Sequence, residues 1–257
     1  MKNIKIVVAT HKSYWMPEDE VYYPLQVGAE GKIALGNRFK SDNTGVNISG
    51  KNTNYCELTG LYWAWKNLDA EYIGLVHYRR QFAMRRWTKD RRYILSGEQI
   101  SALLDECDVL LPVKRNYWIE TSYSQYAHAH HAADLDITRE IIAERHPEYV
   151  SAYDAAMKLT TGHRFNMLIM KRDILDSYCT WLFGILFELE KRLDISDYSD
   201  NDKRVFGFVA ERMMDVWLTT NKIRFKDIPY IFLENENWLR KGTRFVLRKI
   251  IKKSLDV

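Results

Sequence analysis

The sequence predicts an α/β fold in which one large, mostly parallel sheet is flanked by helices. Short apolar runs bounded by polar residues are typical of buried strands, and they occur at 4–9, 72–76, 109–112 and 165–170. The longer segments between them repeat apolar residues at helical spacing. Strands that alternate with helices in this way are typical of a parallel sheet. The 257 residues are enough to bury one large core.

The first strand, at 4–9, ends at Thr10 and His11. Ligands of open α/β sheets bind at the carboxyl ends of the strands, so these two polar side chains are candidate ligand contacts. Residues 13–52 then form a long stretch rich in Tyr, Gly, Asn and Asp. We expect this stretch to be irregular, and a loop of such length is more often a binding loop than a plain connector.

A helix is predicted next, with Asn54 as its cap. Glu57 lies three residues further on, and apolar residues recur at helical spacing over 58–65. The same spacing predicts further helices over 97–106, 134–145, 147–158, 173–193 and 203–219, and a last strand lies within 226–233.

The composition argues against several classes of protein. With 38 basic and 34 acidic residues, the net charge of +4 is too small to indicate a nucleic-acid-binding protein. The 3 cysteines form no paired motif, so we expect a reducing cytosol and neither a disulfide scaffold nor a zinc finger. The first apolar run is too short for a signal peptide, and no run is long enough to span a membrane. The glycine motifs of dinucleotide-binding and P-loop proteins are absent.

The last segment, 238–257, differs from the rest of the chain. Basic residues dominate it, and apolar residues are interspersed at roughly helical spacing. This pattern is typical of an amphipathic helix that lies on a membrane surface. A docked C-terminal helix with a solvated basic face is the alternative. We therefore divide the chain into a globular domain, 1–237, and a basic tail, 238–257.

Basic residues follow the second buried strand directly. His77, Arg79 and Arg80 come at its end, and more basic residues follow between 85 and 92. A guanidinium group can bind two phosphate oxygens at once, so Arg79 and Arg80 suit a diphosphate at the sheet edge. A solvated basic loop is the alternative, and from position 85 onward it is the better interpretation.

Two further motifs bring polar side chains into apolar surroundings. A glycine precedes His163 and Asn166 at the start of a strand, so both side chains are candidates for sugar binding. A turn glycine with a hydrogen-bonded His and Asn explains this motif equally well. Glu211 begins an apolar helical face, where a carboxylate with a raised pKa can act as a general base. A surface Glu paired with a neighbouring arginine is the alternative.

Histidines and tyrosines gather within 123–131. Their spacing fits no familiar zinc site, so no metal is predicted. Tyr126 and His131 are candidates for contacts with an acceptor or sugar, and a structural helix start is the alternative. The Asp-x-Asp triplets at 134–136 and 200–202 follow no apolar strand, so we interpret them as helix caps and solvated loops.

Several segments taken together resemble a family of bacterial glycosyltransferases that is described as a domain of unknown function and occurs in capsular and exopolysaccharide gene clusters. They cover most of the chain and are more specific together than any single motif. The matching segments are IVVATHK (6–12), DNTGVNIS (42–49), KNTNYCELTGLYWAWKN (51–67), YIGLVHYRRQF (72–82), NYWIETSYSQYAHAHHAADLDI (116–137), TGHRFNMLIMKR (161–172) and RVFGFVAERMMDVWL (204–218).

The resemblance implies a GT-A-like single domain with a Rossmann-like sheet. It also implies transfer of a hexose, in some members galactofuranose, from a nucleotide diphosphate donor to a growing repeat unit. Segment 77–80 stands where other GT-A enzymes carry a metal-binding Asp-x-Asp motif, so neither a cofactor nor a metal is expected. Thr10, His11, Asp42 and Asn43 become candidates for binding the donor nucleotide. Asn54 and Glu57 are considered with them, although a capped helix explains these two equally well.

The expected reaction follows from these assignments. A UDP-sugar binds near the first strand, and Arg79, Arg80 and His77 neutralise the departing diphosphate. Glu211 deprotonates the acceptor hydroxyl, which gives inversion; the sequence leaves retention open. The basic tail holds the cytoplasmic enzyme at the inner membrane face, where a lipid-linked oligosaccharide acceptor lies.

Two other functions use the same residues. A sugar-phosphate transferase or nucleotidyltransferase would place its phosphates at the same basic strand end. A non-catalytic module for RNA or anionic glycan would use the basic residues at 79–92 and the aromatic side chains as a stacking platform. Free nucleoside diphosphate as a product distinguishes a glycosyltransferase from both, because a binding module has no turnover.

Overall fold

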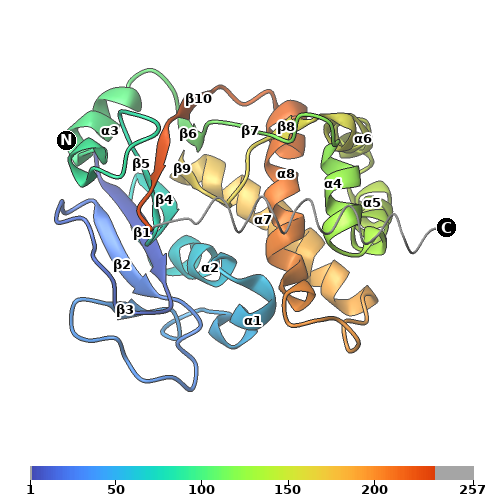
Figure 1. Ribbon diagram of the computed structural model, residues 1–257, viewed down its shortest axis with the longest axis horizontal. Coiled ribbons are helices and arrows are strands. Elements are labelled where there is room, and N and C mark those ends of the chain that lie inside the picture. The colour runs from blue at the N-terminus through green and yellow to red at the C-terminus, as the bar shows by residue number, and fades with distance from the viewer. Residues whose placement is uncertain (1, 235–257) are drawn as a thin grey trace.

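The computed structural model describes residues 2–234, and its centre is a nine-stranded sheet. Figure 1 shows the sheet beside a set of helices. The main path of the sheet runs in the order β10-β6-β9-β4-β1-β2-β3, and β5 and β11 extend it beside β4. The strands are β1 Ile4–Thr10, β2 Tyr22–Gln26, β3 Lys40–Ser41, β4 Tyr72–His77, β5 Arg80–Phe82, β6 Val109–Pro112, β9 Leu168–Lys171, β10 Phe225–Ile228 and β11 Tyr230–Phe232.

Most neighbouring strands on the main path are parallel. β1 pairs in parallel with β2 and β4, β2 with β3, and β10 with β6. β9 is the exception, because it runs antiparallel to both β4 and β6. A second, small sheet joins β7, Arg115–Asn116, to β8, Thr161–Gly162. The predicted fold class, α/β with a mostly parallel sheet, is confirmed.

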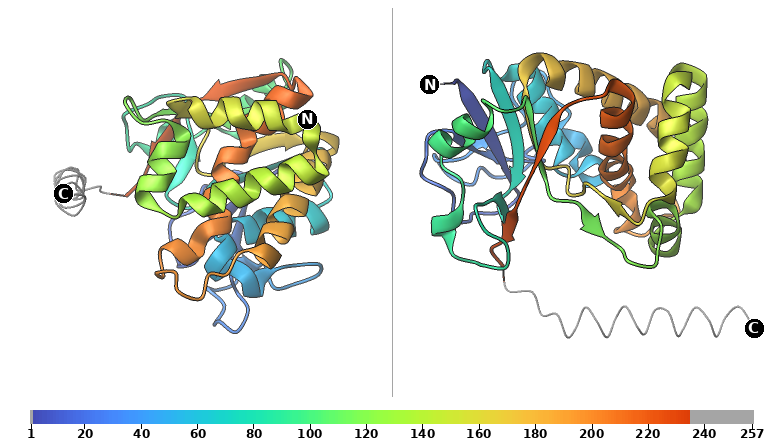
Figure 2. Two further views of the ribbon diagram at one scale, coloured as in Figure 1. Left: turned by 90° about the vertical axis from the view of Figure 1, so that its right-hand side faces the viewer. Right: turned by 90° about the horizontal axis from the view of Figure 1, so that it is seen from above.

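The helices form two layers on one face of the sheet and a smaller cover on the other. Figure 2 shows α2, α7 and α8 against the sheet, with α4, α5 and α6 as an outer layer and α3 on the opposite face. The α-helices are α1 Asn52–Tyr55, α2 Leu58–Asn67, α3 Gly97–Leu103, α4 Ser122–Ala129, α5 Ala132–Arg145, α6 Val150–Lys158, α7 Arg172–Arg192 and α8 Val205–Asn221, and the short 3₁₀ helices are η1 Ser49–Lys51, η2 Arg91–Tyr93, η3 Pro147–Tyr149 and η4 Asp202–Arg204.

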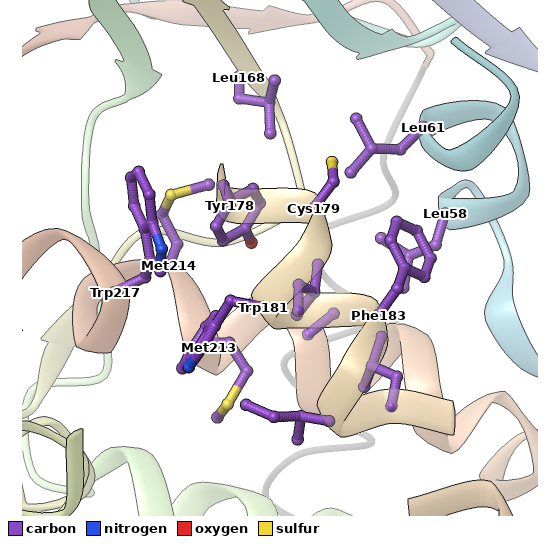
Figure 3. Close-up of a cluster of buried hydrophobic side chains, with 14 of the residues drawn as sticks. Leu58, Leu61, Leu168, Tyr178, Cys179, Trp181, Phe183, Met213, Met214 and Trp217 are labelled. Atoms are coloured by element: carbon purple, nitrogen blue, oxygen red, sulfur yellow. The ribbon is translucent and has the colours of Figure 1, made fainter. Parts of the chain in front are cut away.

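Both faces of the sheet are buried, which explains the continuous apolar runs of its strands. In β1, Val7 faces the larger core beneath the two helix layers, whereas Ile6 and Val8 face the smaller core beneath α3. Figure 3 shows the larger core, where residues of α7 and α8 such as Trp181 and Trp217 pack beneath Leu168 of β9.

Gly74 permits the close pairing of β4 with β9. A Cβ atom at this position would lie 2.9 Å from a side-chain carbon of Ile169 and 3.0 Å from the carbonyl oxygen of Leu168. Such contacts are too short for any larger residue to occupy position 74 without moving β9. The glycine therefore fixes the distance between the two strands whose ends carry the candidate site.

Three predicted elements differ from the structure. Residues 13–52 are not one irregular stretch, because β2 lies within them and pairs with β1. The helix predicted from Asn54 is broken between α1 and α2 at Cys56, whose φ of 52° is in the left-handed region. Asn54 is not a cap: it lies inside α1 and donates a hydrogen bond to the carbonyl oxygen of Lys203.

The strand predicted at 165–170 begins later than expected, at Leu168. Phe165 and Asn166 both have positive φ angles, 74° and 53°, so the chain turns sharply before it enters β9. Two adjacent non-glycine residues in this region are uncommon and indicate a segment held by its tertiary contacts.

The basic tail at 238–257 and the domain boundary at 237 lie outside the described residues, so both stay predictions. Within residues 2–234, no helix has the length and apolar composition needed to cross a bilayer.

Candidate active site

Several segments that are distant in the sequence meet at one edge of the sheet. β1 and β4 end side by side there, with Ala9 opposite His77. β9 runs in the opposite direction, so the loop before it reaches the same edge: Leu168 pairs with Leu75. The start of α8 also reaches this edge, because the Asn166 side chain donates a hydrogen bond to the carbonyl oxygen of Gly207.

Glu57, His77 and Asn166 form a buried polar network at this edge. Asn166 Nδ2 donates to Glu57 Oε1 over 2.7 Å, and His77 Nε2 lies 3.9 Å from the same oxygen. His77 Nε2 is 2.6 Å from the carbonyl oxygen of Phe165, so this ring nitrogen carries the proton. Burial and the charge of Arg80 lower the pKa of His77 to about 4, so the imidazole is neutral at pH 7.

Glu57 is a carboxylate with perturbed acidity. Its side chain is only 13% exposed. Burial raises its pKa, although the Asn166 hydrogen bond and the charges of Arg204 and Arg80 act in the opposite direction. Its position depends on the break at Cys56, which redirects the chain between α1 and α2. From the sequence, a capped helix explains Glu57 as well as a contact with the donor nucleotide does, and no local signal decides between the two.

The two arginines after β4 both lie near the aromatic ring of Phe232. Arg80 places its guanidinium carbon 4.4 Å from the centre of the Phe165 ring and 4.9 Å from that of Phe232, which β11 brings to β5. Arg79 also lies near Phe232, at 5.8 Å. Arg79 Nε is buried and has no hydrogen-bond partner among residues 2–234.

A carboxylate already occupies a position between two of the cations at this edge. Glu234 lies 2.9 Å from Lys12 Nζ and 3.5 Å from Arg79 Nη1. His11 packs edge-on against Tyr78, and burial, followed by the charges of Lys12 and Arg79, lowers its pKa. The ends of β1 and β4 therefore form an electropositive position that holds an anionic group. Lys12 was not among the predicted site residues, although it directly follows His11.

Glu211 lies near the same network, on α8. Its side chain is 22% exposed and lies 3.9 Å from Arg212. The charges of both Glu57 and Glu211 act on Arg204. Both carboxylates therefore favour the charged form of the Arg204 guanidinium group. The structure brings together Glu211, His77 and Asn166 with the two arginines, as a common site requires.

Asp42 has a structural role. The fully buried carboxylate accepts hydrogen bonds from the backbone N–H groups of Gly28 and Ala29, over 2.9 and 3.0 Å, and from the hydroxyl groups of Ser49 and Thr59. These donors leave no open position for a nucleotide, so we remove Asp42 from the donor site.

The two other polar residues predicted near the nucleotide differ in their surroundings. Thr10 is buried, and its hydroxyl group donates to the carbonyl oxygen of Lys12 over 2.6 Å and accepts from the N–H group of the same residue. These bonds close a local turn after β1, which is the role the structure gives it. Asn43 is exposed to solvent beside Asp42.

His163 is held inside the protein by two carboxylates. Nδ1 lies 2.7 Å from Asp215 and Nε2 lies 2.9 Å from Asp227, so neither ring nitrogen is open to a ligand. Burial alone would lower the pKa of His163, but the hydrogen bonds to Asp215 and Asp227 outweigh burial and raise it. The predicted role of His163 in sugar binding is therefore replaced by a structural link between α8 and β10.

Tyr126 and His131 also make internal contacts. Tyr126 is fully buried and donates a hydrogen bond to Asp134 over 2.7 Å. His131 stacks on Tyr198 with ring centres 4.0 Å apart, and its Nε2 is 3.9 Å from Asp202. These contacts support the structural interpretation of segment 123–131. Asp134 is a buried acceptor for two tyrosine hydroxyl groups, which corrects its predicted role as a helix cap.

Among residues 2–234, no three His, Cys, Asp or Glu side chains are grouped closely enough to hold a metal ion. The charged and polar groups at the sheet edge include the carboxylates of Glu57, Glu211 and Glu234, the neutral imidazole of His77, and the cationic side chains of Lys12, Arg79 and Arg80.

Comparisons with known proteins agree with the sequence motifs. The family model described as Domain of unknown function (DUF4422) matches residues 5–222. A solved structure titled "WbbM bifunctional glycosytransferase apo structure" matches at 30% sequence identity with a TM-score of 0.84. The match covers 91% of this chain and 46% of that one, so this chain spans about half the length of that protein. A search of curated proteins found no match. These findings confirm the family resemblance and the GT-A-like α/β fold.

Proposed function

The chain belongs to the DUF4422 family, and on this premise we propose that it is a glycosyltransferase that uses the sheet edge described above. The similarity of fold and sequence to a bifunctional glycosyltransferase supports this proposal. The donor we propose is a UDP-linked hexose, galactofuranose or galactose, and the acceptor is a lipid-linked oligosaccharide in capsular, exopolysaccharide or O-antigen synthesis. The basic tail at 238–257 would hold the enzyme at the cytoplasmic face of the membrane.

The proposal of a nucleotide diphosphate donor rests on the anion-binding position at the ends of β1 and β4. Glu234 lies there between Lys12 and Arg79, and Arg79 keeps a buried N–H group without a partner among the described residues. A diphosphate carries more charge than one carboxylate and has more acceptor oxygens. It would therefore displace Glu234 and accept a hydrogen bond from the buried Nε–H group of Arg79. Arg80 also lies near Phe232, and its charge acts on Glu57.

Glu57 is the first candidate for the general base. An efficient general base has a pKa near the working pH, and burial raises the pKa of Glu57 toward that range. Asn166 fixes one carboxylate oxygen, which orients the group. Glu211 is the second candidate, because it is the more exposed of the two carboxylates and lies near the same arginine.

The proposed step transfers one proton and exchanges one bond. The acceptor hydroxyl gives its proton to the carboxylate, and its oxygen bonds to the anomeric carbon of the donor. The bond from that carbon to the diphosphate oxygen breaks, and its electron pair leaves with UDP. Arg79 and Arg80 stabilise the charge that develops on the leaving group. Attack from the face opposite the diphosphate gives inversion.

Donor binding is tested with a panel of nucleotide sugars, with and without Mn²⁺, by thermal shift and then by calorimetry. A ligand of the native state raises its apparent stability. Arg79→Ala should weaken UDP binding by about tenfold or more, since it removes a charge-assisted hydrogen-bonding group. Arg139→Ala is the matched control, because Arg139 pairs with Asp154 at an exposed site. Equal UDP affinity in the two variants would rule out the assigned role of Arg79.

The general base is identified with the variants Glu57→Gln and Glu211→Gln. For each variant, the turnover rate and the donor affinity are measured with the same donor. Loss of a general base lowers the rate by about 10²–10⁴-fold while the donor still binds. The variant that shows this pattern identifies the base, and near-normal turnover in both would refute the mechanism. Product analysis tests the reaction class, because a nucleotidyltransferase releases pyrophosphate or monophosphate in place of UDP.

A further inference from the structure

Two loops of the structure present a tryptophan to solvent. Trp87 follows β5 and is 92% exposed, and Trp118 follows β7 and is 81% exposed. Tryptophan is highly buried on average, so two rings this exposed are unusual in a globular domain. Both residues also have positive φ angles, 61° and 64°, a conformation that large residues seldom adopt. The backbone of each loop thus holds a costly conformation and leaves an apolar ring in water.

The bases of both loops are fixed by backbone hydrogen bonds. In the first loop, the N–H group of Met84 donates to the carbonyl oxygen of Tyr93 over 2.8 Å, which closes the loop above β5. In the second, the N–H group of Tyr117 donates to the carbonyl oxygen of Thr160, also over 2.8 Å. Each tryptophan is therefore carried on a short, anchored segment, and little ordering is needed before it binds a surface.

Each loop combines further apolar exposure with positive charge. Met84 and Ile119 are exposed beside the two tryptophans. Exposed basic residues flank the first tryptophan in the sequence, and only one acid lies among them. In residues 84–93 the basic residues are Arg85, Arg86, Lys89, Arg91 and Arg92, and the acid is Asp90, which pairs with Arg92. Lys114, which pairs with Asp215, and Arg115 precede the second ring.

The two loops and the candidate active site share one side of the molecule. In both views of Figure 2, the segment between β5 and α3 and the segment between β7 and α4 lie along the side toward which β4 ends. The first loop continues directly from β5, which begins with Arg80. The second is tied to α8, because Arg164 donates to the hydroxyl of Tyr117 and to the backbone oxygen of Glu211.

We propose that these two loops form a membrane-docking surface for an anionic bilayer. Tryptophan partitions into the headgroup region, where its ring is buried and its N–H group stays hydrated. Arginine and lysine around it attract anionic headgroups. Exposed rings on two separate loops suit a broad, flat surface, whereas a small ligand needs a concave site. This charge and shape complementarity favours a bilayer as the partner.

This surface is distinct from the basic tail, and the two would act together. A single weak anchor gives only marginal, reversible membrane binding, and stable attachment takes two signals. The consequence for catalysis rests on the proposed function: docking through these loops would turn Arg79, Arg80 and the two carboxylates toward a lipid-linked acceptor.

The test uses the full chain and vesicles of phosphatidylcholine with 30% phosphatidylglycerol. Trp87→Ser combined with Trp118→Ser should weaken binding on the order of tenfold or more, the effect expected when buried apolar side chains are lost. Ile33→Ser is the matched control, because Ile33 is 91% exposed in a loop between β2 and β3. Both variants change only exposed side chains, and equal thermal unfolding temperatures verify that they fold.

A second measurement detects insertion directly. Brominated lipids quench a tryptophan that enters the bilayer, so they should quench the wild-type protein and the Ile33→Ser variant strongly. The double tryptophan variant should be quenched clearly less, because of the candidate membrane-binding tryptophans only Trp238 of the basic tail is left. Replacing Arg85 and Arg86 with Gln should weaken binding to anionic vesicles and leave binding to neutral vesicles unchanged, with about a fivefold loss for each charge.

Three outcomes would overturn the proposal. The first is unchanged vesicle binding in the double tryptophan variant, with all binding lost when residues 240–257 are deleted, since the tail alone would then be the anchor. The second is the absence of lipid quenching in wild type. The third is binding of a single-stranded RNA oligonucleotide through the same loops without binding to vesicles. Vesicle binding needs no donor sugar, so its outcome is separate from the test of glycosyl transfer.

Discussion

Replacing Asp215 with Asn tests the structural role that the geometry gives to His163. Burial alone would raise the pKa of Asp215, but the hydrogen bonds from His163 and the charge of Lys114, 3.3 Å away, lower it to about 2 from an ordinary value of 3.8. A shift of this size corresponds to about 2 kcal/mol of folding stability at about 1.4 kcal/mol per pKa unit. The carboxylate is 11% exposed, so screening by water is limited.

Because the pKa of Asp215 is lowered on folding, the stability that it contributes depends on pH. A lowered folded-state pKa gives stability that is fully present above the unfolded value, near pH 3.8, and is lost as the pH falls through about 2. At pH 6 the contribution is complete. Asp215→Asn should therefore lower the free energy of unfolding by about 2 kcal/mol at pH 6, measured by urea denaturation with the slope m held comparable.

Asp227→Asn is the matched control, because Asp227 contacts the other nitrogen of the same imidazole. Its side chain is 38% exposed, compared with 11% for Asp215, so solvent screens the interaction. We expect a loss below about 1 kcal/mol, the usual range for exposed ion pairs. Equal losses in the two variants, or a larger loss in Asp227→Asn, would refute this account of the His163 site.

Three further predictions follow from the other contacts. The raised pKa of His163 gives stability that is present below the unfolded value near pH 6.5 and lost as the pH rises through the folded value; urea denaturation across this range should show that fall in wild type and not in His163→Gln. Glu234→Gln should tighten UDP binding by up to about fivefold in calorimetry, because it removes an internal competitor for Lys12 and Arg79; weaker binding would contradict the anion position. Asp42→Ala should cost about 3 kcal/mol of stability in denaturation because buried donors lose their acceptor, and a folded variant with weakened UDP binding would return Asp42 to the donor site.

The sheet could largely be predicted from the sequence because its strands are buried on both faces. Apolar runs such as 72–76 have no other ready explanation, and β4 occupies Tyr72–His77. β2, Tyr22–Gln26, was missed because its sequence YYPLQ contains a proline and no clear alternation of apolar and polar residues. The break at Cys56 was missed because the flanking residues have ordinary helical spacing, and the left-handed backbone there depends on tertiary contacts.

The candidate site could be predicted only in part. Basic residues directly after an apolar strand are visible in the sequence, so Arg79 and Arg80 can be proposed as site residues from the sequence alone. Whether a polar side chain is free to bind a ligand depends on partners that are distant along the chain. Asp42 and His163 resemble ligand contacts in the sequence, but their donors and acceptors are satisfied inside the protein. For Glu57 the sequence leaves a helix start and a ligand contact equally open, because its contact with Asn166 exists only after folding.

The reversed direction of β9 has a consequence for how the protein folds. Gly74 of β4 pairs with Ile169 of β9, so this pairing closes a very long loop of chain. Contacts between residues so far apart in sequence carry a large loop-closure entropy and form slowly. The turn at Phe165 and Asn166 cannot reach the end of β4 until that pairing is complete. In refolding experiments, we therefore expect UDP binding to return with the slowest phase, after most of the helical circular dichroism signal has recovered.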